Sequence, residues 1–206
     1  MSKHSVDQIR NIVFCGHGSA GKTTLVDKIL TTFGGVNRNT SVDDGTSICD
    51  FDEEEKQHKY SIESSVVHCE HAGNRYNIID TPGYPDFIGQ AIGAMRGTDT
   101  AAIVINAQAG IEVNTRRVFN EAKKAGLGKI IVINKMDADN INFTALIDAI
   151  RELFGPSCAL LNVPIGQGAE FSGVAGTLKP PADAAGALID PNEINQSLLE
   201  SIIEAD

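Results

Sequence analysis

The sequence predicts an α/β domain in which helices cover both faces of a mostly parallel β-sheet. Short apolar segments of strand length alternate with longer segments of helical spacing from residue 9 to residue 154. This alternation is typical of parallel strands, because each parallel neighbour is reached through a crossover connection, usually a helix. Two strand-like segments separated by a short glycine-containing turn also predict one antiparallel hairpin in the sheet.

The first predicted strand covers Ile9–Cys15, and a helix covers Lys22–Phe33 after a glycine-rich turn. Residues Gly34–Lys59 are polar and irregular, with an acidic run over Asp50–Glu55. We expect this stretch to be a long mobile loop. Such loops are uncommon in compact domains and are often functional.

Two strands, Ser61–His71 and Arg75–Asp80, are expected to form the hairpin through Ala72, Gly73 and Asn74. The chain then continues as helix, strand, helix, strand and helix. In chain order these elements cover Asp86–Gly97, Ala101–Asn106, Val113–Ala125, Lys129–Asn134 and Asn142–Phe154.

After residue 155 the pattern changes to shorter apolar pieces and a last helix. They cover Ala159–Ile165, Phe171–Leu178 and Asn192–Ala205. We therefore expect a core domain at residues 1–155 and a small α+β subdomain, incomplete at its C-terminus, at residues 156–206.

The composition, with 206 residues, 42% hydrophobic and 21% charged, is that of an ordinary globular chain. Its 17 basic and 27 acidic residues give a net charge of −10, so the chain has no overall attraction to nucleic acid, and no direct nucleic-acid site is evident. No segment has the uncharged length of a membrane span or the pattern of a leader peptide. We expect a cytoplasmic protein with no membrane partner.

The four cysteines lack CxxC spacing, which predicts reduced thiols rather than a disulfide framework. His68, Cys69 and His71 form a small cluster that can indicate a metal. On an extended segment, however, Cys69 and His71 share a face while His68 points away. No second pair has the spacing to complete a tetrahedral site, so a zinc centre is not expected.

The segment GHGSAGKT, Gly16 to Thr23, has two glycines separated by four residues and followed by Lys and Thr. This is the spacing of a phosphate-binding loop, and a predicted strand precedes it while a predicted helix follows it. Loop amides and the helix N-terminus together create an anion site. The flanking pattern disfavours the alternative, a plain glycine-rich turn before an amphipathic helix.

Within this loop, glycine permits backbone conformations and close approaches that side chains would block. Lys22 is expected to lie along the β and γ phosphates, and the hydroxyl of Thr23 suits magnesium. The expected phosphate-binding residues are Gly16, His17, Gly18, Ser19, Ala20, Gly21, Lys22, Thr23 and Thr24.

A second segment, DTPG, ends the second strand of the hairpin, at the same edge of the sheet as the phosphate loop. Asp80 can hold magnesium through water. The amide of Gly83 can approach a γ-phosphate and lose that contact after hydrolysis. We expect Asp80, Thr81, Pro82, Gly83 and Tyr84 at the nucleotide, although DTPG taken alone is also simply a turn.

A third segment, NKMD, follows the apolar strand that ends at Asn134. Asp137 can accept hydrogen bonds from N1–H and the amino group of guanine, which adenine cannot supply. Leaving such a group unmatched costs roughly 1–3 kcal/mol and prefers one purine by about tenfold or more. Asn134 supports the base, the stem of Lys135 covers its face, and Met136 completes the expected base-binding set.

These segments, with DTPGYPDF and the later stretch LLNVPIGQGAEFSGVAGTL, make the chain similar to the translational GTPases, most closely to the nucleotide-binding domain of elongation factor G and its paralogues. The resemblance implies a P-loop NTPase three-layer sandwich with a small inserted α+β subdomain. It also implies GTP or GDP with Mg²⁺ as ligands, Thr23 and Asp80 at the magnesium, and Asn134, Lys135 and Asp137 at guanine. Through a longer parent protein, it implies the ribosome as a partner.

The sequence departs from this family at several positions. The loop over Gly34–Lys59 resembles the first switch, and Ser61 stands where the family has a magnesium-binding Thr, whose bond a Ser hydroxyl can also make. Lys59 and Tyr60 replace the usual Gly and Ile. Ser19 replaces an Asp, which removes a carboxylate that can hold a monovalent cation.

The largest departure is Tyr84, which stands where the family has a His that orients the attacking water. The ordinary pKa of tyrosine, near 10, makes it a weak acid or base at neutral pH. The expected catalytic residues are Lys22, Gly83 and Tyr84, and full turnover is expected to need a partner.

The family's final guanine motif follows the inserted subdomain and does not occur before Asp206, so we expect an N-terminal fragment or a truncated relative. In the family the strand Lys129–Ile133 is covered by one more strand. We expect its edge either to pair with a second copy of the chain or to be covered by residues 159–178.

We expect a GTPase in which water attacks the γ-phosphate, weak or inactive as this chain alone. Three alternatives stay open. These are a GTP- or GDP-binding module with little or no hydrolysis, an ATP-using P-loop protein, and a fragment too incomplete to bind nucleotide.

Overall fold

The computed structural model describes residues 4–36 and 40–205. Contacts divide the chain into two compact units, Met1–Asn106 with Glu112–Asn134, and Ala107–Ile111 with Lys135–Asp206. The division into domains at residue 155 stays a prediction, and residues 37–39 of the expected mobile loop lie outside the described part. Within that part, no helix combines the length and the apolar character that a membrane crossing needs.

The first unit contains a five-stranded sheet with the strand order β2-β3-β1-β4-β5. Its strands are β1 (Ile9–Gly16), β2 (Ser65–His71), β3 (Asn74–Asp80), β4 (Thr100–Asn106) and β5 (Gly128–Asn134). All neighbouring strands run parallel except β2 and β3, which are antiparallel. This confirms the predicted mostly parallel sheet with one hairpin strand.

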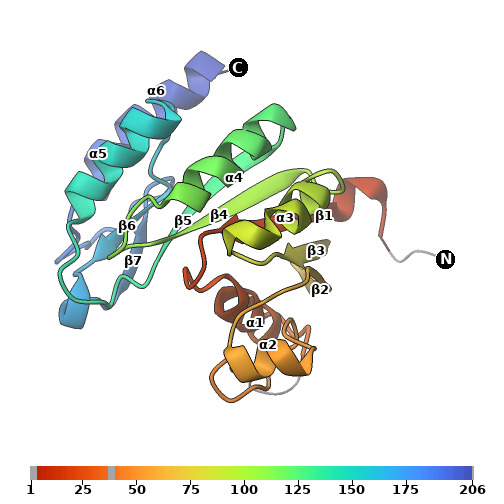
Figure 1. Cartoon of the computed structure of the whole chain (residues 1–206). Helices are drawn as coiled ribbons and strands as arrows, with labels where there is room; N and C mark the ends of the chain where they lie inside the picture. The colour runs from red at the N-terminus through yellow and green to blue at the C-terminus, as the bar shows by residue number, and fades with distance from the viewer. Residues whose placement is uncertain (1–3, 37–39, 206) are drawn as a thin grey trace. The chain divides into compact units, whose positions relative to one another are not determined.

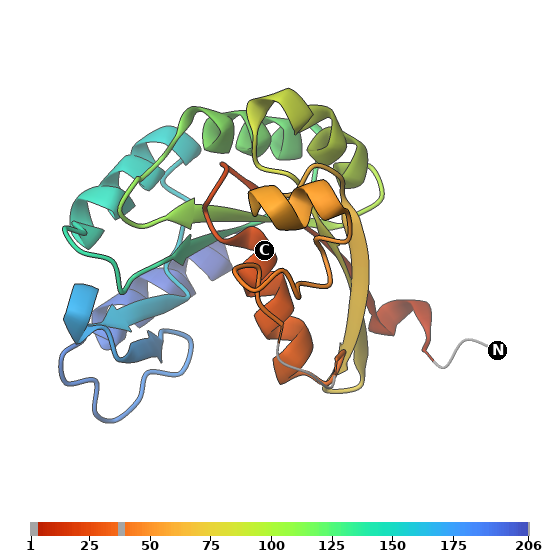
Figure 2. The same ribbon diagram turned by 60° about the horizontal axis from the view of Figure 1, so that its bottom comes forward.

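The helices of the first unit lie on both faces of this sheet. They are α1 (Lys22–Thr32), α2 (Glu53–His58), α3 (Ile88–Met95) and α4 (Val113–Lys124), and short 3-10 turns cover Val6–Gln8 and Pro85–Phe87. Helices α3 and α4 pack side by side on one face, and α1 packs on the other (Figures 1 and 2). The three-layer α/β fold is therefore confirmed.

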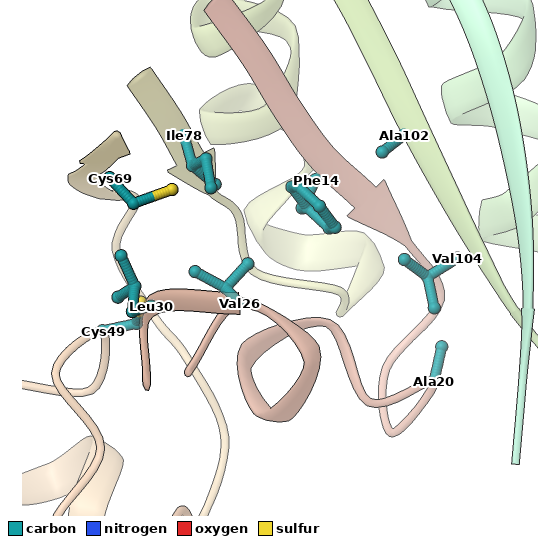
Figure 3. Close-up of a cluster of buried hydrophobic side chains, with 9 residues drawn as sticks. All are labelled: Phe14, Ala20, Val26, Leu30, Cys49, Cys69, Ile78, Ala102 and Val104. Carbon is teal, nitrogen blue, oxygen red and sulfur yellow. The ribbon is translucent and has the colours of Figure 1, made fainter. Parts of the chain in front are cut away.

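A buried apolar cluster lies between α1 and the sheet (Figure 3). Val26 and Leu30 of α1 meet Phe14 of β1, Ile78 of β3 and Val104 of β4, and all five are at most 5% exposed. Burial of this apolar surface, worth about 25 cal/mol per Å², anchors α1 beneath the sheet. The start of α1 is thereby held at the carboxyl end of β1, where the first motif lies.

The hairpin is tighter than the sequence indicated. His71 pairs with Asn74, so the turn contains only Ala72 and Gly73, which have φ values of 48° and 78°. Positive φ at both central residues is the requirement of a type I′ turn. The strand β2 also begins at Ser65 rather than at the expected Ser61.

The segment expected to be a long mobile loop contains the helix α2. Its N-terminus is a capping box, in which the side chain of Asp52 accepts a hydrogen bond from the amide of Glu54 and the side chain of Glu55 accepts one from the amide of Asp52. These bonds satisfy amides that a helix start otherwise leaves free. The expectation of an irregular loop was wrong here, because reciprocal side-chain bonds order the acidic run.

The second unit has α+β character. It contains α5 (Phe143–Phe154), β6 (Asn162–Ile165), β7 (Gly173–Gly176) and α6 (Pro191–Ala205), with a 3-10 turn at Gly168–Glu170. Strands β6 and β7 pair with each other in a separate antiparallel sheet. Among the described residues of the first unit, β5 pairs only with β4. The expected covering of its edge by residues 159–178 stays a prediction.

Candidate functional site

The glycine-rich loop connects β1 to α1. At two of its positions, Gly16 and Gly21, the backbone conformation favours glycine. A Cβ at Gly16, whose φ is 146°, would lie 2.3 Å from the carbonyl oxygen of Val104. Gly21 adopts a left-handed conformation with φ 88° and caps α1 without a side-chain hydrogen bond. The first amides of α1 therefore lack a side-chain cap, which is the arrangement that binds anions at helix N-termini.

Lys22, the first residue of α1, lies inside this loop. Its side chain is 6% exposed, and its Nζ donates a hydrogen bond of 2.9 Å to the carbonyl oxygen of His17. Burial lowers the pKa of Lys22, while the neighbouring charge of Asp80 opposes that shift. Nε2 of His17 lies 3.3 Å from a carboxylate oxygen of Glu112. A buried cation thus sits within the loop that the sequence assigns to phosphates.

Thr23, Ser61 and Asp80, the three residues expected at magnesium, lie together. Thr23 Oγ1 donates to Asp80 Oδ2 at 2.7 Å, and it lies 3.1 Å from Ser61 Oγ. Ser61 Oγ in turn donates to Asp50 Oδ1 at 2.7 Å. Two hydroxyls and two carboxylates form a continuous chain of oxygen atoms beside the phosphate loop.

This oxygen-rich cluster fits a hard divalent cation. Within the described part of the chain, Asp80 Oδ1 and Asp50 Oδ2 are buried and have no hydrogen-bond partner. Burial raises the pKa of Asp80 to about 7, although the hydrogen bond from Thr23 and the charge of Lys22 oppose the shift. A Mg²⁺ ion prefers such oxygen ligands and would satisfy the free carboxylate oxygens.

The DTPG turn packs directly on the phosphate loop. Thr81 donates both its amide (3.2 Å) and its hydroxyl (2.7 Å) to the carbonyl oxygen of Phe14 in β1. A Cβ on Gly83 would lie 2.3 Å from Lys22 Nζ and 2.7 Å from the amide nitrogen of Gly18. Only glycine fits at this close approach. Pro82, between them, is buried.

Tyr84 lies over the phosphate loop and packs against a second aromatic ring. A Cβ on Gly18 would lie 3.4 Å from the Tyr84 ring. The ring of Tyr60 lies 5.0 Å from that of Tyr84, centroid to centroid, in an edge-to-face arrangement. Tyr84 remains 39% exposed. The aromatic contact joins the segment before Ser61 to the DTPG turn.

The NKMD residues divide between the two units. Asn134, at the end of β5, donates a hydrogen bond of 2.9 Å from Nδ2 to the carbonyl oxygen of Ala20, which ties β5 to the phosphate loop. Lys135, Met136 and Asp137 belong to the second unit. There Lys135 is exposed with φ 61°, Met136 is buried and Asp137 is exposed. The carbonyl of Met136 accepts a 2.8 Å bond from the amide of Gly168, which holds the turn.

Of the other expected residues, Ala20 is buried, whereas Ser19 and Thr24 are exposed. Sequence reasoning missed three buried polar residues that hold the site. Asn114 of α4 donates to the carbonyl oxygen of Gly83 at 2.8 Å, Asp50 accepts from Ser61, and Glu55 accepts from the chain that follows Ser61. The pattern Asp52-x-x-Glu55 was a usable signal for α2. No comparable pattern marks Asn114.

Comparison with known proteins agrees with this geometry. The family model described as "Elongation factor Tu GTP binding domain" matches residues 7–204. The chain belongs to this family. Its phosphate loop, DTPG turn and NKMD turn are thus parts of a GTP-binding domain, and the resemblance inferred from the sequence is confirmed.

The similar proteins are translation factors by name. The chain is 32% identical over 205 residues to an "Elongation factor G-like protein" of Mycobacterium tuberculosis, covering 95% of this chain and 28% of that protein. It is 34% identical to "Elongation factor G" of Petrotoga mobilis, covering 96% and 29%. It is 36% identical to the bovine (Bos taurus) "Ribosome-releasing factor 2, mitochondrial", covering 84% and 22%.

A solved structure shows the same fold. A crystal structure of a protein from Thermus thermophilus superposes with a TM-score of 0.86 and 29% sequence identity, covering 97% of this chain and 32% of that one. The chain thus spans about a third or less of the length of each protein it matches. It is a GTP-binding domain of the elongation factor G-like kind.

Proposed function

We propose that the chain binds GTP or GDP together with Mg²⁺, with the phosphates in the loop from Gly16 to Thr24. The observation that carries this proposal is the pair formed by Thr23 and Asp80 at the start of α1. It presents a free, buried carboxylate oxygen beside Lys22 and uncapped helix amides. Anion donors and a cation site side by side are what a magnesium nucleotide requires.

The base is read by the turn that follows β5. Asn134 holds the phosphate loop through Ala20. Asp137, which follows it in the NKMD segment, presents an exposed carboxylate that can accept from N1–H and the amino group of guanine. Lys135 offers its aliphatic stem to the face of the base. ATP, the runner-up nucleotide, offers no matching donors, which supports guanine over adenine.

Calorimetric titration with GDP and Mg²⁺ tests binding and base recognition together. Asp137→Ala should lower the affinity for GDP by about tenfold or more. The affinity for IDP, which lacks the 2-amino group, should change much less. Asp139→Ala is the control, because Asp139 is also an exposed carboxylate in the same turn. No GDP binding at high micromolar concentration would support the reading of an incomplete fragment. Full competition by ATP would contradict guanine recognition.

We further propose that the chain supports hydrolysis of GTP by in-line attack of water on the γ-phosphate. Mg²⁺, when bound, neutralises charge that develops on the phosphate oxygens. Lys22 adds a buried positive charge, and Gly83 packs closely on Lys22 and the phosphate loop, where its amide can sense the γ-phosphate. Tyr84 holds its ring over Gly18 and offers a hydroxyl that can position water.

The second candidate function is a nucleotide-binding module with little or no hydrolysis. Tyr84 favours it, because a tyrosine hydroxyl is a poor base and its ring is already packed against Tyr60. Single-turnover GTP assays with and without ribosomes separate the two readings. Phosphate release that ribosomes stimulate supports the enzyme. Tight GTP binding without release supports the module.

The ribosome is the proposed partner of the longer protein to which such a domain belongs. The support is that the similar proteins are named elongation factors G and a ribosome-releasing factor. A reducing cytoplasmic setting is supported by the cysteines, since Cys15, Cys49 and Cys69 are buried thiols. Recruitment of the chain by ribosomes in a pelleting assay with GTP analogues tests this partner.

A further inference from the structure

Glu55 is a fully buried carboxylate that no part of the proposed chemistry uses. It lies in the first turn of α2 and has 0% exposure. Its Oε2 accepts from the amide of Asp52 at 3.1 Å, which completes the capping box. Its Oε1 accepts two more hydrogen bonds, from the amides of Ile62 at 2.8 Å and Glu63 at 3.0 Å.

Capping of α2 does not account for the two hydrogen bonds that Glu55 accepts from Ile62 and Glu63. A capping box involves only the helix N-terminus, whereas these bonds reach seven and eight residues along the chain. Helix α2 ends at His58, and Lys59 turns the chain in a left-handed conformation with φ 57°. The segment that follows this turn is hydrogen-bonded to Glu55 through its backbone amides.

Ser61 is the residue immediately before the two fastened amides. Its hydroxyl lies 3.1 Å from Thr23 Oγ1 and donates to Asp50 at 2.7 Å. Different partners therefore hold the hydroxyl of Ser61 and the backbone that follows it. Two amides in a row bond the same oxygen of Glu55, so Glu55 fixes the backbone that follows Ser61.

We propose that Glu55 is a positioning residue for the magnesium site: through the amides of Ile62 and Glu63 it holds Ser61 beside Thr23, whose hydroxyl bonds Asp80. This rests on the proposed function, in which Thr23, Ser61 and Asp80 bind Mg²⁺ with the nucleotide. Glu55 does not touch the ion. It fixes the backbone from which a hydroxyl ligand reaches it, as outer residues orient the ligands of metal sites.

The first test separates magnesium binding from nucleotide binding in the full chain. The affinity for fluorescent mant-GDP is measured in EDTA, and Mg²⁺ is then titrated into the GDP-loaded protein. Glu55→Gln keeps one acceptor oxygen but cannot carry a negative charge. It should lower the affinity for Mg²⁺ by at least about tenfold, while the affinity for GDP in EDTA should change by less than about twofold. Glu54→Gln, an exposed neighbour in the same helix, should match the wild type.

A double-mutant cycle tests whether Glu55 acts through Ser61. Ser61→Ala should lower the affinity for Mg²⁺. Adding Glu55→Gln to it should lower that affinity no further, because the ligand that Glu55 positions is already gone. Additive losses would overturn the proposal. Glu55→Asp, which keeps the charge but shortens the reach, should also weaken Mg²⁺ and provides a second variant if Glu55→Gln folds poorly.

Hydrogen exchange gives a readout without metal or nucleotide. In the free chain the amides of Ile62 and Glu63 should exchange at least about tenfold faster in Glu55→Gln than in the wild type or in Glu54→Gln. Unchanged exchange would overturn the proposed hold. If Thr23→Ala removes the Mg²⁺ effect and Glu55→Gln does not, only the positioning role fails. If Mg²⁺ has no effect on the wild type, the proposed function fails as well.

Discussion

At the scale of single residues, Asp80 links the site to pH, because burial raises its pKa. Burial raises its pKa to about 7, and the charges of Asp50 and Asp27 add to the shift, while Thr23 and Lys22 reduce it. An unfolded chain has an aspartate pKa near 3.9. Between these two values the folded chain holds a proton that the unfolded chain has released.

This difference predicts how stability depends on pH. Without metal, the free energy of unfolding should fall as pH rises from about 4 to about 7, by at most about 4 kcal/mol from Asp80. The contribution is fully present below the unfolded pKa and lost as pH rises through the folded one. Urea denaturation across this range measures it. Asp80→Asn should flatten the slope, and an unchanged slope in that variant would contradict the assignment.

The sequence predicted which motif residues gather at the site, but it did not predict the hydrogen bonds that hold them there. The spacing of the phosphate loop and the strand ends brought Thr23 and Asp80 to one place, because parallel strands end at one edge of a sheet. Asp50, Glu55 and Asn114 could not be found in the same way. Their roles depend on hydrogen bonds to backbone groups or side chains 11, 7 and 31 residues away.

At the scale of elements, the turn of the β2–β3 hairpin has an alanine at a position whose backbone conformation favours asparagine or glycine. Ala72 has φ 48° and is followed by Gly73 with φ 78°. A left-handed conformation is unfavourable for an L-residue other than Asn, Asp or Gly, and Asn-Gly is the preferred pair in this turn type. The sequence offers the glycine but not the asparagine.

Replacing this alanine should therefore stabilise the hairpin. We expect Ala72→Asn to raise the free energy of unfolding by about 0.5–1 kcal/mol, because Asn tolerates positive φ. Ala72→Val should lower it, since a β-branched side chain is strained there. Both variants change an exposed position, and chemical denaturation compares them with the wild type. Equal stability of all three would contradict the turn assignment.

The strands and long helices were predictable because each carries its own periodic signal. The interior strand β4 is buried along most of its length, and its apolar run marks it clearly. Helix α2 was missed because six residues are too few for a periodic signal, and its order depends on Asp52 and Glu55 instead. The start of β2 was placed too early because Ser61–Ser64 bends toward Glu55 rather than pairing with β3.

At the scale of the whole molecule, strand pairing and net charge act in opposite directions. Strand β5 is an edge of the first sheet and carries the apolar run Ile130–Ile133, of which Ile130 is 44% exposed. An edge strand of this kind can pair with an identical strand, and two-fold pairing is self-complementary. The net charge of −10 on each copy opposes such pairing through repulsion.

We propose, as the sequence indicated, that the chain self-associates through β5, and the balance of forces makes this salt-dependent. Sedimentation analysis at high concentration should show monomers at low salt and dimers at about 0.5 M salt, where the Debye length is only a few ångströms. Ile130→Lys should abolish the dimer by placing a charge on the pairing edge. Val113→Lys makes the same change at an 80% exposed position of α4 and should not. Loss of the dimer in Val66→Lys instead would assign the pairing to β2, the opposite edge of the sheet.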